Sequence, residues 1–292
     1  MHRLAGCVVA LTAACSVDIP DVHPGVCDPN AGFVQLAPVA GLGELGEQTA
    51  RLSPDELTIV FSRELPALVP RYGDLYVAHR ADRGDDFDDV TALDAVNSDA
   101  DEFSASFSED MLTLYFDRQV EGGRYEILAA TRTRSSDAFG GPVTILLGAD
   151  SSSNFEPFAA AGAIFFASTR SSGVANLFSA SGAGTSFASP APVMPPTSQV
   201  AYEHPVVAVD GLTIYFSAPP DSSTKRDIWT AARSARDQPF GAPHPVAALD
   251  TASIEFPTWI SSDSCRLYFM TDRTQSTLKP NFELWMASRR TP

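Results

Sequence analysis

The sequence predicts an all-β fold, a five-bladed β-propeller with four antiparallel strands per blade and an N-terminal strand that closes the last blade. An aliphatic-aromatic strand recurs five times at a spacing of roughly fifty residues, and an acidic-aliphatic-aromatic strand follows each copy. A fixed period of this length is typical of propellers and other repeat folds. The copies of the first strand are 57–61 (LTIVF), 112–116 (LTLYF), 163–166 (AIFF), 212–216 (LTIYF) and 266–269 (RLYF). Those of the second are 74–78 (DLYVA), 126–130 (EILAA), 176–180 (NLFSA), 227–231 (DIWTA) and 283–287 (ELWMA).

Two further strands complete each repeat. A Phe opens a short, often proline-containing extended segment, which suits an outer edge strand because proline cannot donate to a ladder. A recurring acid then precedes a short inner strand, and an Asp or Gly turn leads into the aliphatic-aromatic strand. The middle strands are apolar on consecutive residues, as expected when neighbouring blades cover both faces. The opening residues are Phe33, Phe87, Phe139, Phe187 and Phe240.

The phase of the repeat predicts how the ring closes. The repeats begin with an outer-strand segment at Phe33 and end just after the third strand of the last unit, at residues 284–288. Pairing of these two segments would complete the fifth blade and remove an exposed sheet edge. Cys27 and Cys265 would then lie in the closing blade, and a disulfide between them is a hypothesis. Two free, buried thiols remain the alternative, because a bridge needs Cα atoms within about 7 Å.

The N-terminal segment predicts export. Residues 1–15 read as a signal peptide with a short positive start and an apolar stretch. Residues 12–15 (TAAC) resemble a bacterial lipobox, which predicts lipid attachment at Cys15; residues 4–7 (LAGC) fit by residue type but leave almost no apolar stretch before them. Cleavage without lipidation, or a buried strand, is the alternative. Residues 16–32 read as a flexible tether and residues 33–292 as the propeller. The expected location is the periplasmic face of the bacterial envelope or the outer membrane.

The amino-acid composition indicates which classes of partner to expect. There are 36 Asp and Glu against 20 Lys and Arg, a net charge of −16. Such a field repels a phosphate backbone, so nucleic acid is not an expected partner. No apolar run reaches the 18 or more residues that span a bilayer, so membrane contact is expected only through the N-terminal lipid. The domain is expected to be monomeric, with an envelope protein or peptide as its partner.

No motif for a metal, a cofactor or a covalent mechanism is present in the sequence. The candidate binding residues are acids that recur near the start of each innermost strand, close to the mouth of the central channel. They could bind backbone or Arg at a blade junction, form a ring for a cation or a basic partner, or include a glycosidase pair. Repetition favours the structural role, because catalysis needs carboxylates in unlike environments. These residues are Glu47, Glu102, Glu203 and Glu255.

Two other patterns recur. Four copies of the third strand place an Arg six residues after the acid, which predicts ion pairs between blades. Variable loops at residues 64–72, 219–226 and 274–281 occupy the same point of their repeats and predict a binding surface on one face of the disc. The arginines are Arg80, Arg132, Arg233 and Arg289.

The repeats resemble the TolB-type WD-like (PD40) propeller repeat. The resemblance rests on 52–55 (LSPD), 107–110 (FSED), 210–216 (DGLTIYF) and 227–229 (DIW), and it spans about residues 33–290. It implies a propeller of the bacterial envelope, although TolB has six blades and an additional N-terminal domain, and the third copy here (159–162, AAAG) lacks the turn. The expected function is a non-catalytic, lipid-anchored protein-binding or scaffolding module. The alternative is a carbohydrate-active, glycosidase-like enzyme that uses carboxylates in the channel.

Overall fold

The computed structural model describes residues 27–29, 31–42, 49–64, 73–148, 151–220, 225–273 and 282–290. Within these ranges every regular element is a β-strand, and no helix is long and apolar enough to cross a membrane. The predicted signal peptide with Cys15, Glu47 and most of the predicted tether lie outside the described residues.

Twenty-one strands form five antiparallel sheets, one for each blade. Blade 1 contains β2 (Ala50–Leu52), β3 (Thr58–Glu64), β4 (Gly73–His79) and β5 (Asp88–Ala92). Blade 2 contains β6 (Glu102–Phe107), β7 (Thr113–Val120), β8 (Arg124–Thr131) and β9 (Val143–Thr144). Blade 3 contains β10 (Asn154–Ala160), β11 (Ala163–Ser168), β12 (Asn176–Ala183), β13 (Ser186–Phe187) and β14 (Ala191–Pro192). Blade 4 contains β15 (Glu203–Val207), β16 (Thr213–Ala218), β17 (Asp227–Ala232) and β18 (His244–Pro245). Blade 5 contains β19 (Glu255–Ile260), β20 (Arg266–Thr271), β21 (Glu283–Arg289) and β1 (Phe33–Pro38).

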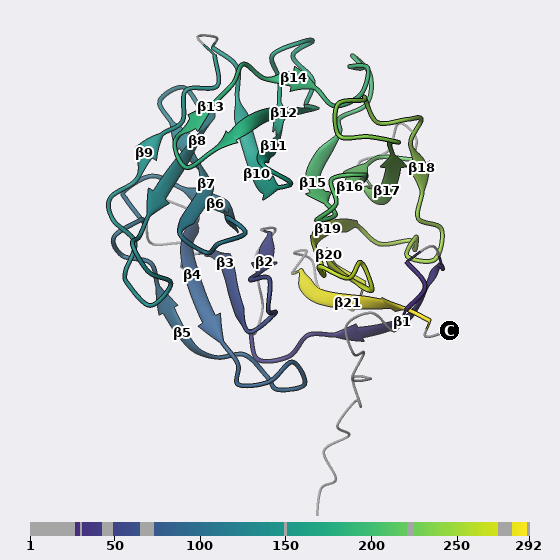
Figure 1. Ribbon diagram of the computed structural model, residues 1–292, viewed down its shortest axis with the longest axis horizontal. Coiled ribbons are helices and arrows are strands. Elements are labelled where there is room, and N and C mark those ends of the chain that lie inside the picture. The colour runs from purple at the N-terminus through teal and green to yellow at the C-terminus, as the bar shows by residue number, and fades with distance from the viewer. Residues whose placement is uncertain are drawn as a thin grey trace, which may run out of the picture.

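The blades stand in a ring, with β2, β6, β10, β15 and β19 nearest its centre (Figure 1). The predicted five-bladed propeller is therefore confirmed. Its core lies between blades, where the last Phe of each aliphatic-aromatic strand has no solvent exposure. Burying both faces of each blade explains why these strands are apolar on consecutive residues. The five equivalent rings are Phe61, Phe116, Phe166, Phe216 and Phe269.

Closure of the ring follows the predicted route. The N-terminal β1 pairs antiparallel with the C-terminal β21, from Phe33 opposite Arg289 to Pro38 opposite Trp285. Beside this pairing Cys27 and Cys265 form a disulfide, with their Cα atoms 5.8 Å apart. The two ends of the chain are thus joined within one blade by backbone hydrogen bonds and by a covalent bond.

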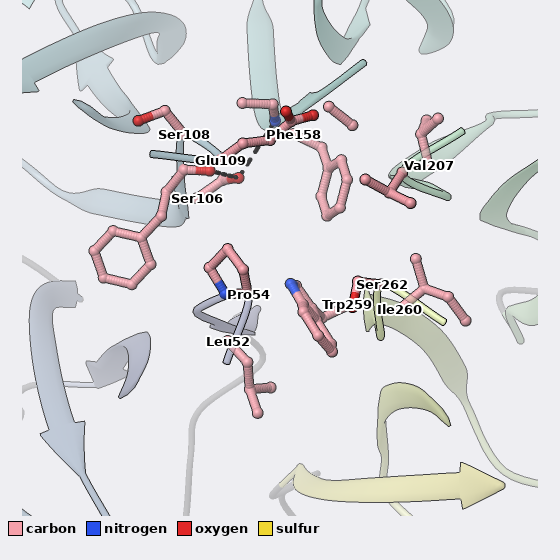
Figure 2. A pocket seen from close by; sticks show the side chains of 14 residues that line it. Leu52, Pro54, Ser106, Ser108, Glu109, Phe158, Val207, Trp259, Ile260 and Ser262 are labelled. Atoms are coloured by element: carbon pink, nitrogen blue, oxygen red, sulfur yellow. Dashed lines mark hydrogen bonds between the residues drawn. The ribbon is translucent and has the colours of Figure 1, made fainter. Parts of the chain in front are cut away.

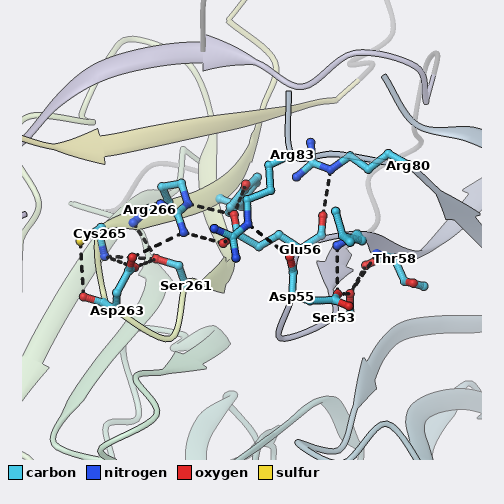
Figure 3. A network of polar contacts seen from close by, with 12 residues as sticks. Ser53, Asp55, Glu56, Thr58, Arg80, Arg83, Ser261, Asp263, Cys265 and Arg266 are labelled. Carbon is cyan, nitrogen blue, oxygen red and sulfur yellow. Dashed lines mark hydrogen bonds and ion pairs between the residues drawn. The ribbon is translucent and has the colours of Figure 1, made fainter. Parts of the chain in front are cut away.

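The seam between blades 5 and 1 carries a buried ion pair (Figure 3). The Glu56 carboxylate accepts hydrogen bonds from Arg266 Nη2 at 2.6 Å and Nε at 2.9 Å, and from the Tyr268 hydroxyl at 2.7 Å. Glu56 is 1% exposed and Arg266 5% exposed. Ionic partners so deeply buried must satisfy one another, so this contact ties the last blade to the first.

The recurring arginines of the third strand have a different role from the one predicted. Instead of the predicted ion pairs, the structure shows each guanidinium stacked on the Phe that opens an outer segment, with Nε donating to a carbonyl of the neighbouring turn. Each arginine therefore makes both a cation–π contact and a hydrogen bond at the corner of its blade. The pairs are Arg80–Phe87, Arg132–Phe139, Arg233–Phe240 and Arg289–Phe33, at 4.3 to 4.5 Å, with carbonyls of Glu56, Met111, Gly211 and Ser264.

Candidate functional site

The central channel opens on one face of the disc into an apolar hollow (Figure 2). This face carries the turns that follow the innermost strands. Each of the five blades contributes a side chain, so the hollow belongs to the ring as a whole. Its volume is about 140 Å³, and a cavity of about 150 Å³ is known to hold a benzene molecule. The central lining residues are Leu52, Ser106, Phe158, Val207 and Trp259.

Most of the lining is apolar, while its rim is polar. Trp259 stands with its ring edge-on to Tyr268, with centroids 5.7 Å apart, and so has a fixed orientation. Val209 lies at the rim and is 47% exposed. Glu109, also at the rim, accepts a hydrogen bond from the Ala161 amide at 2.8 Å. A hollow of this size and polarity suits one apolar side chain of a partner.

Arg51 lies beneath this hollow and crosses the channel. It belongs to the innermost strand of blade 1, and its Nη1 donates to the Pro157 carbonyl in blade 3. These blades are not neighbours, so the bond spans the centre of the ring. The guanidinium also lies 5.2 Å from the centroid of the Phe158 ring, which lines the hollow. Burial lowers the pKa of Arg51 to about 10, so the side chain remains charged at neutral pH.

The innermost strands of blades 2, 3, 4 and 5 each carry a β-bulge. In blades 2, 3 and 4 two residues stand opposite one Phe of the next strand. The first bulge residue has a positive φ each time, 53° at Ser104, 56° at Glu156 and 55° at His204. Such left-handed backbone costs about 1–3 kcal/mol in residues other than Gly, and it clusters at functional or tightly packed sites.

Glu156 and His204, which occupy two of these bulges, belong to a polar layer in the channel. We term this layer the channel cluster, and it consists of Arg51, Asp117, Glu156, Glu203, His204 and Arg226. Asp117 accepts a hydrogen bond from the Glu156 amide at 2.7 Å. Glu156 in turn accepts one from the His204 amide at 2.5 Å, and its other oxygen lies 3.0 Å from His204 Nε2. Glu203 pairs with Arg226 at 2.5 Å. The cluster therefore links blades 1 to 4 around the axis.

Burial sets the protonation of the cluster. It raises the pKa of Asp117 to about 6. Burial, and then the charge of Glu203, raise the pKa of Glu156 well above its ordinary value. Burial, and then Arg226, lower the pKa of His204 well below its ordinary value. Because the pKa of His204 is lowered in this way, its contact with Glu156 at neutral pH is a hydrogen bond of a neutral imidazole rather than an ion pair.

His204 also connects to a serine. Its Nδ1 lies 2.8 Å from Ser217 Oγ, so a Ser–His–Glu order runs through Ser217, His204 and Glu156. A nucleophilic serine must meet its substrate, and Ser217 has no solvent exposure. The contacts with Ser217 and Glu156 thus hold the His204 ring in place, and this ring also stacks on Phe256 with centroids 4.2 Å apart.

The glutamates predicted from the repeat do not behave as one ring. Glu102 and Glu255 are both fully buried and occupy equivalent positions. Each pairs with the residue two positions after the shared Phe of the next strand, Glu102 with Arg118 and Glu255 with Thr271. Glu102 pairs with Arg118 at 2.6 Å, and Glu255 with Arg273 at 3.2 Å. These are contacts of the structural kind considered above.

Glu203 is offset from that pair by one residue. It stands opposite Ser217, one residue beyond Phe216 and directly before the bulge at His204 and Pro205, whereas Glu102 lies two residues before the equivalent bulge of blade 2. A shift of one residue turns a side chain to the other face of the strand. Glu203 thus joins the channel cluster while Glu102 and Glu255 do not, and Glu47 lies outside the described residues.

Two groups of side chains have spacing that could hold a cation. Glu156, Glu203 and His204 offer ligand atoms within 4.8 Å of one another, but the Arg226 guanidinium already binds Glu203. Asp227, Asp250 and Glu255 form the second group. There the Lys225 ammonium lies 2.6 Å from Asp227 and 2.8 Å from Asp250. In both groups a side-chain cation takes up the negative charge.

Several residues of the site carried no signal in the sequence. Arg51 occurs once, in a repeat whose inner strand matches the others poorly. Asp117 looks like one more polar end of a strand. His204 does stand between Glu203 and Pro205, and a departure from the repeat at that point could have marked it. What the repeat conceals is the position of each bulge.

No protein-family model matches the sequence, and no curated protein matches it. Solved structures share the fold. A thermostable family-43 glycoside hydrolase is 11% identical, with 89% of this chain covering 96% of that one and a TM-score of 0.58. An α-L-arabinofuranosidase from Podospora anserina is 14% identical, with coverages of 91% and 99% and a TM-score of 0.51. TolB from Acinetobacter baumannii is 13% identical, with a TM-score of 0.45, and 83% of this chain spans about half (54%) of it. At these identities the likeness shows a propeller and nothing finer.

Proposed function

We propose that this chain is a non-catalytic binding module, a propeller whose central hollow receives an apolar side chain of a partner protein at the bacterial envelope. The observation that carries the proposal is the hollow itself. It is open, apolar and built by all five blades, with Trp259 and Phe158 as fixed aromatic walls. Aromatic side chains in such a position are typical anchors of protein interfaces.

The chemistry of the channel supports binding over catalysis. Glu156 and Glu203 have oxygens within 4.8 Å of one another, near the carboxyl separation of about 5–5.5 Å that retaining glycosidases use. Each, however, is held by a protein partner, His204 and Arg226 respectively. A carboxylate held in this way is not free to protonate or attack a sugar. Export and lipid attachment at Cys15 complete the proposal and rest on the sequence alone.

One observation favours the second candidate, a glycosidase-like enzyme. Asp117, Glu156 and Glu203 come from three blades and have unlike environments, and a carboxyl with a pKa of about 6 can serve as a general acid. If this reading holds, the full chain hydrolyses oligosaccharides, and Glu156→Gln and Asp117→Asn abolish the turnover while leaving the fold intact.

The test is capture of a partner by the full chain from an envelope extract, followed by identification and by a binding measurement with the purified partner. Val209→Asp places a charge at the rim of the hollow and should weaken that binding at least tenfold. Val143→Asp is the matched control, because Val143 is 50% exposed and Val209 47% exposed, and Val143 lies on β9, away from the hollow. Equal affinities for both variants, or glycan turnover with no partner, would reject the proposal.

A further inference from the structure

The junction between blades 1 and 2 contains a groove of about 840 Å³, about six times the volume of the central hollow. It runs along the outer part of the junction and meets the hollow at Phe107. We call it the blade 1–2 groove. Such a volume has room for several residues of a partner rather than for one side chain.

One face of blade 1 forms a wall of this groove. Thr58 pairs with His79, and Val77 pairs with Thr91, and residues two apart on a strand share a face. The four side chains therefore lie together on the side of the sheet that faces blade 2. Nearer the channel the same face is closed, because Val60 packs into a core with Phe107 and other residues of blade 2.

A layer of apolar side chains closes the floor of the groove. The residue before the shared Phe is aromatic in four blades and is Val60 in the first. Val60 has no solvent exposure and does not line the groove. The rings of Phe107 and Phe139 pack in the same core as Val60, stack with centroids 6.4 Å apart, and both line the groove. Val77, Ala92 and Leu93 extend this apolar lining.

The charges around the groove are mainly negative. Asp55, Asp94 and Asp110 are exposed at its margin, whereas Asp137 lies there half-buried and pairs with Arg134 at 3.0 Å. The Ser108 hydroxyl donates to Asp110 and lowers its pKa, which keeps that carboxylate ionised. Arg132 is committed elsewhere, since its Nε donates to the Met111 carbonyl at 2.8 Å and its guanidinium stacks on Phe139.

The wall of the groove also includes an edge strand. The outermost strand of blade 1, β5, pairs with β4 in the described part of the chain, and Thr91 and Ala92 line the groove (Figure 1). Its outer edge therefore presents backbone donors and acceptors. An extended segment can add to such an edge through main-chain hydrogen bonds while its side chains enter the neighbouring groove.

We infer that the blade 1–2 groove is a second docking site, which takes an extended peptide segment carrying an aromatic or large aliphatic side chain beside Lys or Arg. The apolar side chain enters the groove beside Val77, Ala92 and Leu93, and the basic side chains face the exposed carboxylates of Asp55, Asp94 and Asp110. This site is independent of the function proposed for the central hollow.

The test uses a fluorescein-labelled peptide, Gly-Ser-Lys-Phe-Lys-Phe-Lys-Ser-Gly, and a counterpart with Glu at each Lys, with the full chain and fluorescence polarisation as the readout. The Lys peptide should bind saturably, at least about tenfold tighter than the Glu peptide, and less tightly as NaCl is raised. Absence of saturable binding, or equal binding of both peptides, would overturn the inference.

Surface variants locate the peptide without disturbing the core. Thr91→Trp fills the groove and should weaken binding at least about tenfold, whereas Val90→Trp, on the opposite face of the same strand, should not. Asp94→Lys should weaken binding about fivefold, against Asp99→Lys in the same loop as a control. Val209→Asp should leave the affinity unchanged. A loss with Val209→Asp would place the peptide in the hollow, and equal losses in each variant pair would show non-specific attraction; either result refutes the second site.

Discussion

The seam between the last blade and the first offers the sharpest stability prediction. Replacing Glu56 by Gly removes the carboxylate that accepts three hydrogen bonds from Arg266 and Tyr268. Arg266, 5% exposed, then stays buried without the Glu56 carboxylate, while Asp263 lies 3.5 Å away. Removing one member of a buried ion pair costs about 3–5 kcal/mol, since the other charge stays desolvated.

The effect of the glycine backbone on stability must be separated from the effect of losing the Glu56 carboxylate. Glu56 has φ of 66°, and the equivalent turn position of blade 5 is Ser264, with φ of 59°. Glycine adopts this conformation without strain but costs more entropy on folding. Ser264→Gly makes the same backbone change without removing a charge. Ser264 donates its backbone N–H to the Ser261 carbonyl and accepts a hydrogen bond from Arg289 at its own carbonyl, and glycine can make both bonds. The difference between the two variants reports the contacts of the Glu56 carboxylate, which are those with Arg266 and Tyr268 and an ion pair with the partly exposed Arg83 at 3.5 Å.

The assay is urea unfolding followed by tryptophan fluorescence, after reversibility has been established. Relative to Ser264→Gly, Glu56→Gly should lose about 3–5 kcal/mol, and its melting temperature should fall by at least about 6 °C. Equal stability of the two glycine variants would refute the claim that this ion pair holds the ring closed.

Three further outcomes are expected. Removing the Cys27–Cys265 bridge, which spans 238 residues, should lower the free energy of unfolding by about 2–5 kcal/mol, and alkylation of both cysteines in denatured, unreduced protein would disprove the bridge. Glu102→Gln should cost about 3–5 kcal/mol and Glu203→Gln clearly less, because Glu102 is fully buried and Glu203 is half-buried; equal costs contradict this. Because the pKa of Asp117 is raised to about 6, the folded state holds that proton when the unfolded state has lost it. Wild-type stability should thus fall relative to Asp117→Asn between about pH 4 and pH 6, by on the order of 2–3 kcal/mol, and a pH-independent difference would argue against a raised pKa.

The repeat made the architecture predictable because its physical cause is local. Consecutive apolar residues, a turn residue and an edge-strand proline each report on the strand that carries them. Five copies in phase then fix the number of blades, and the phase predicts that β1 joins β21, as the structure shows. The pairing of Cys27 with Cys265 could only be a hypothesis, because it depends on a distance between strands.

The channel cluster could not be predicted in the same way. The repeat places Glu203 beside Glu102, but Glu203 stands 13 residues before its shared Phe and Glu102 stands 14, and this shift of one residue turns their side chains to opposite faces. Arg51 reaches the carbonyl of Pro157 two blades away, a contact set by the diameter of the ring. The prediction that the arginines of the third strand pair with acids is wrong. Sequence spacing shows which face of a strand an arginine lies on, but not which aromatic side chain packs against it. Arg80, for example, stacks on Phe87.

The most direct test of the binding function is site-specific photo-crosslinking in cells. A photoreactive amino acid is placed at position 209, on the rim of the hollow, and in a second strain at position 143 on β9. The binding account predicts that position 209 gives one recurrent adduct with an envelope protein and that position 143 does not give it. An adduct of equal yield at both positions, or none at position 209 while the protein turns over glycans, would contradict the account.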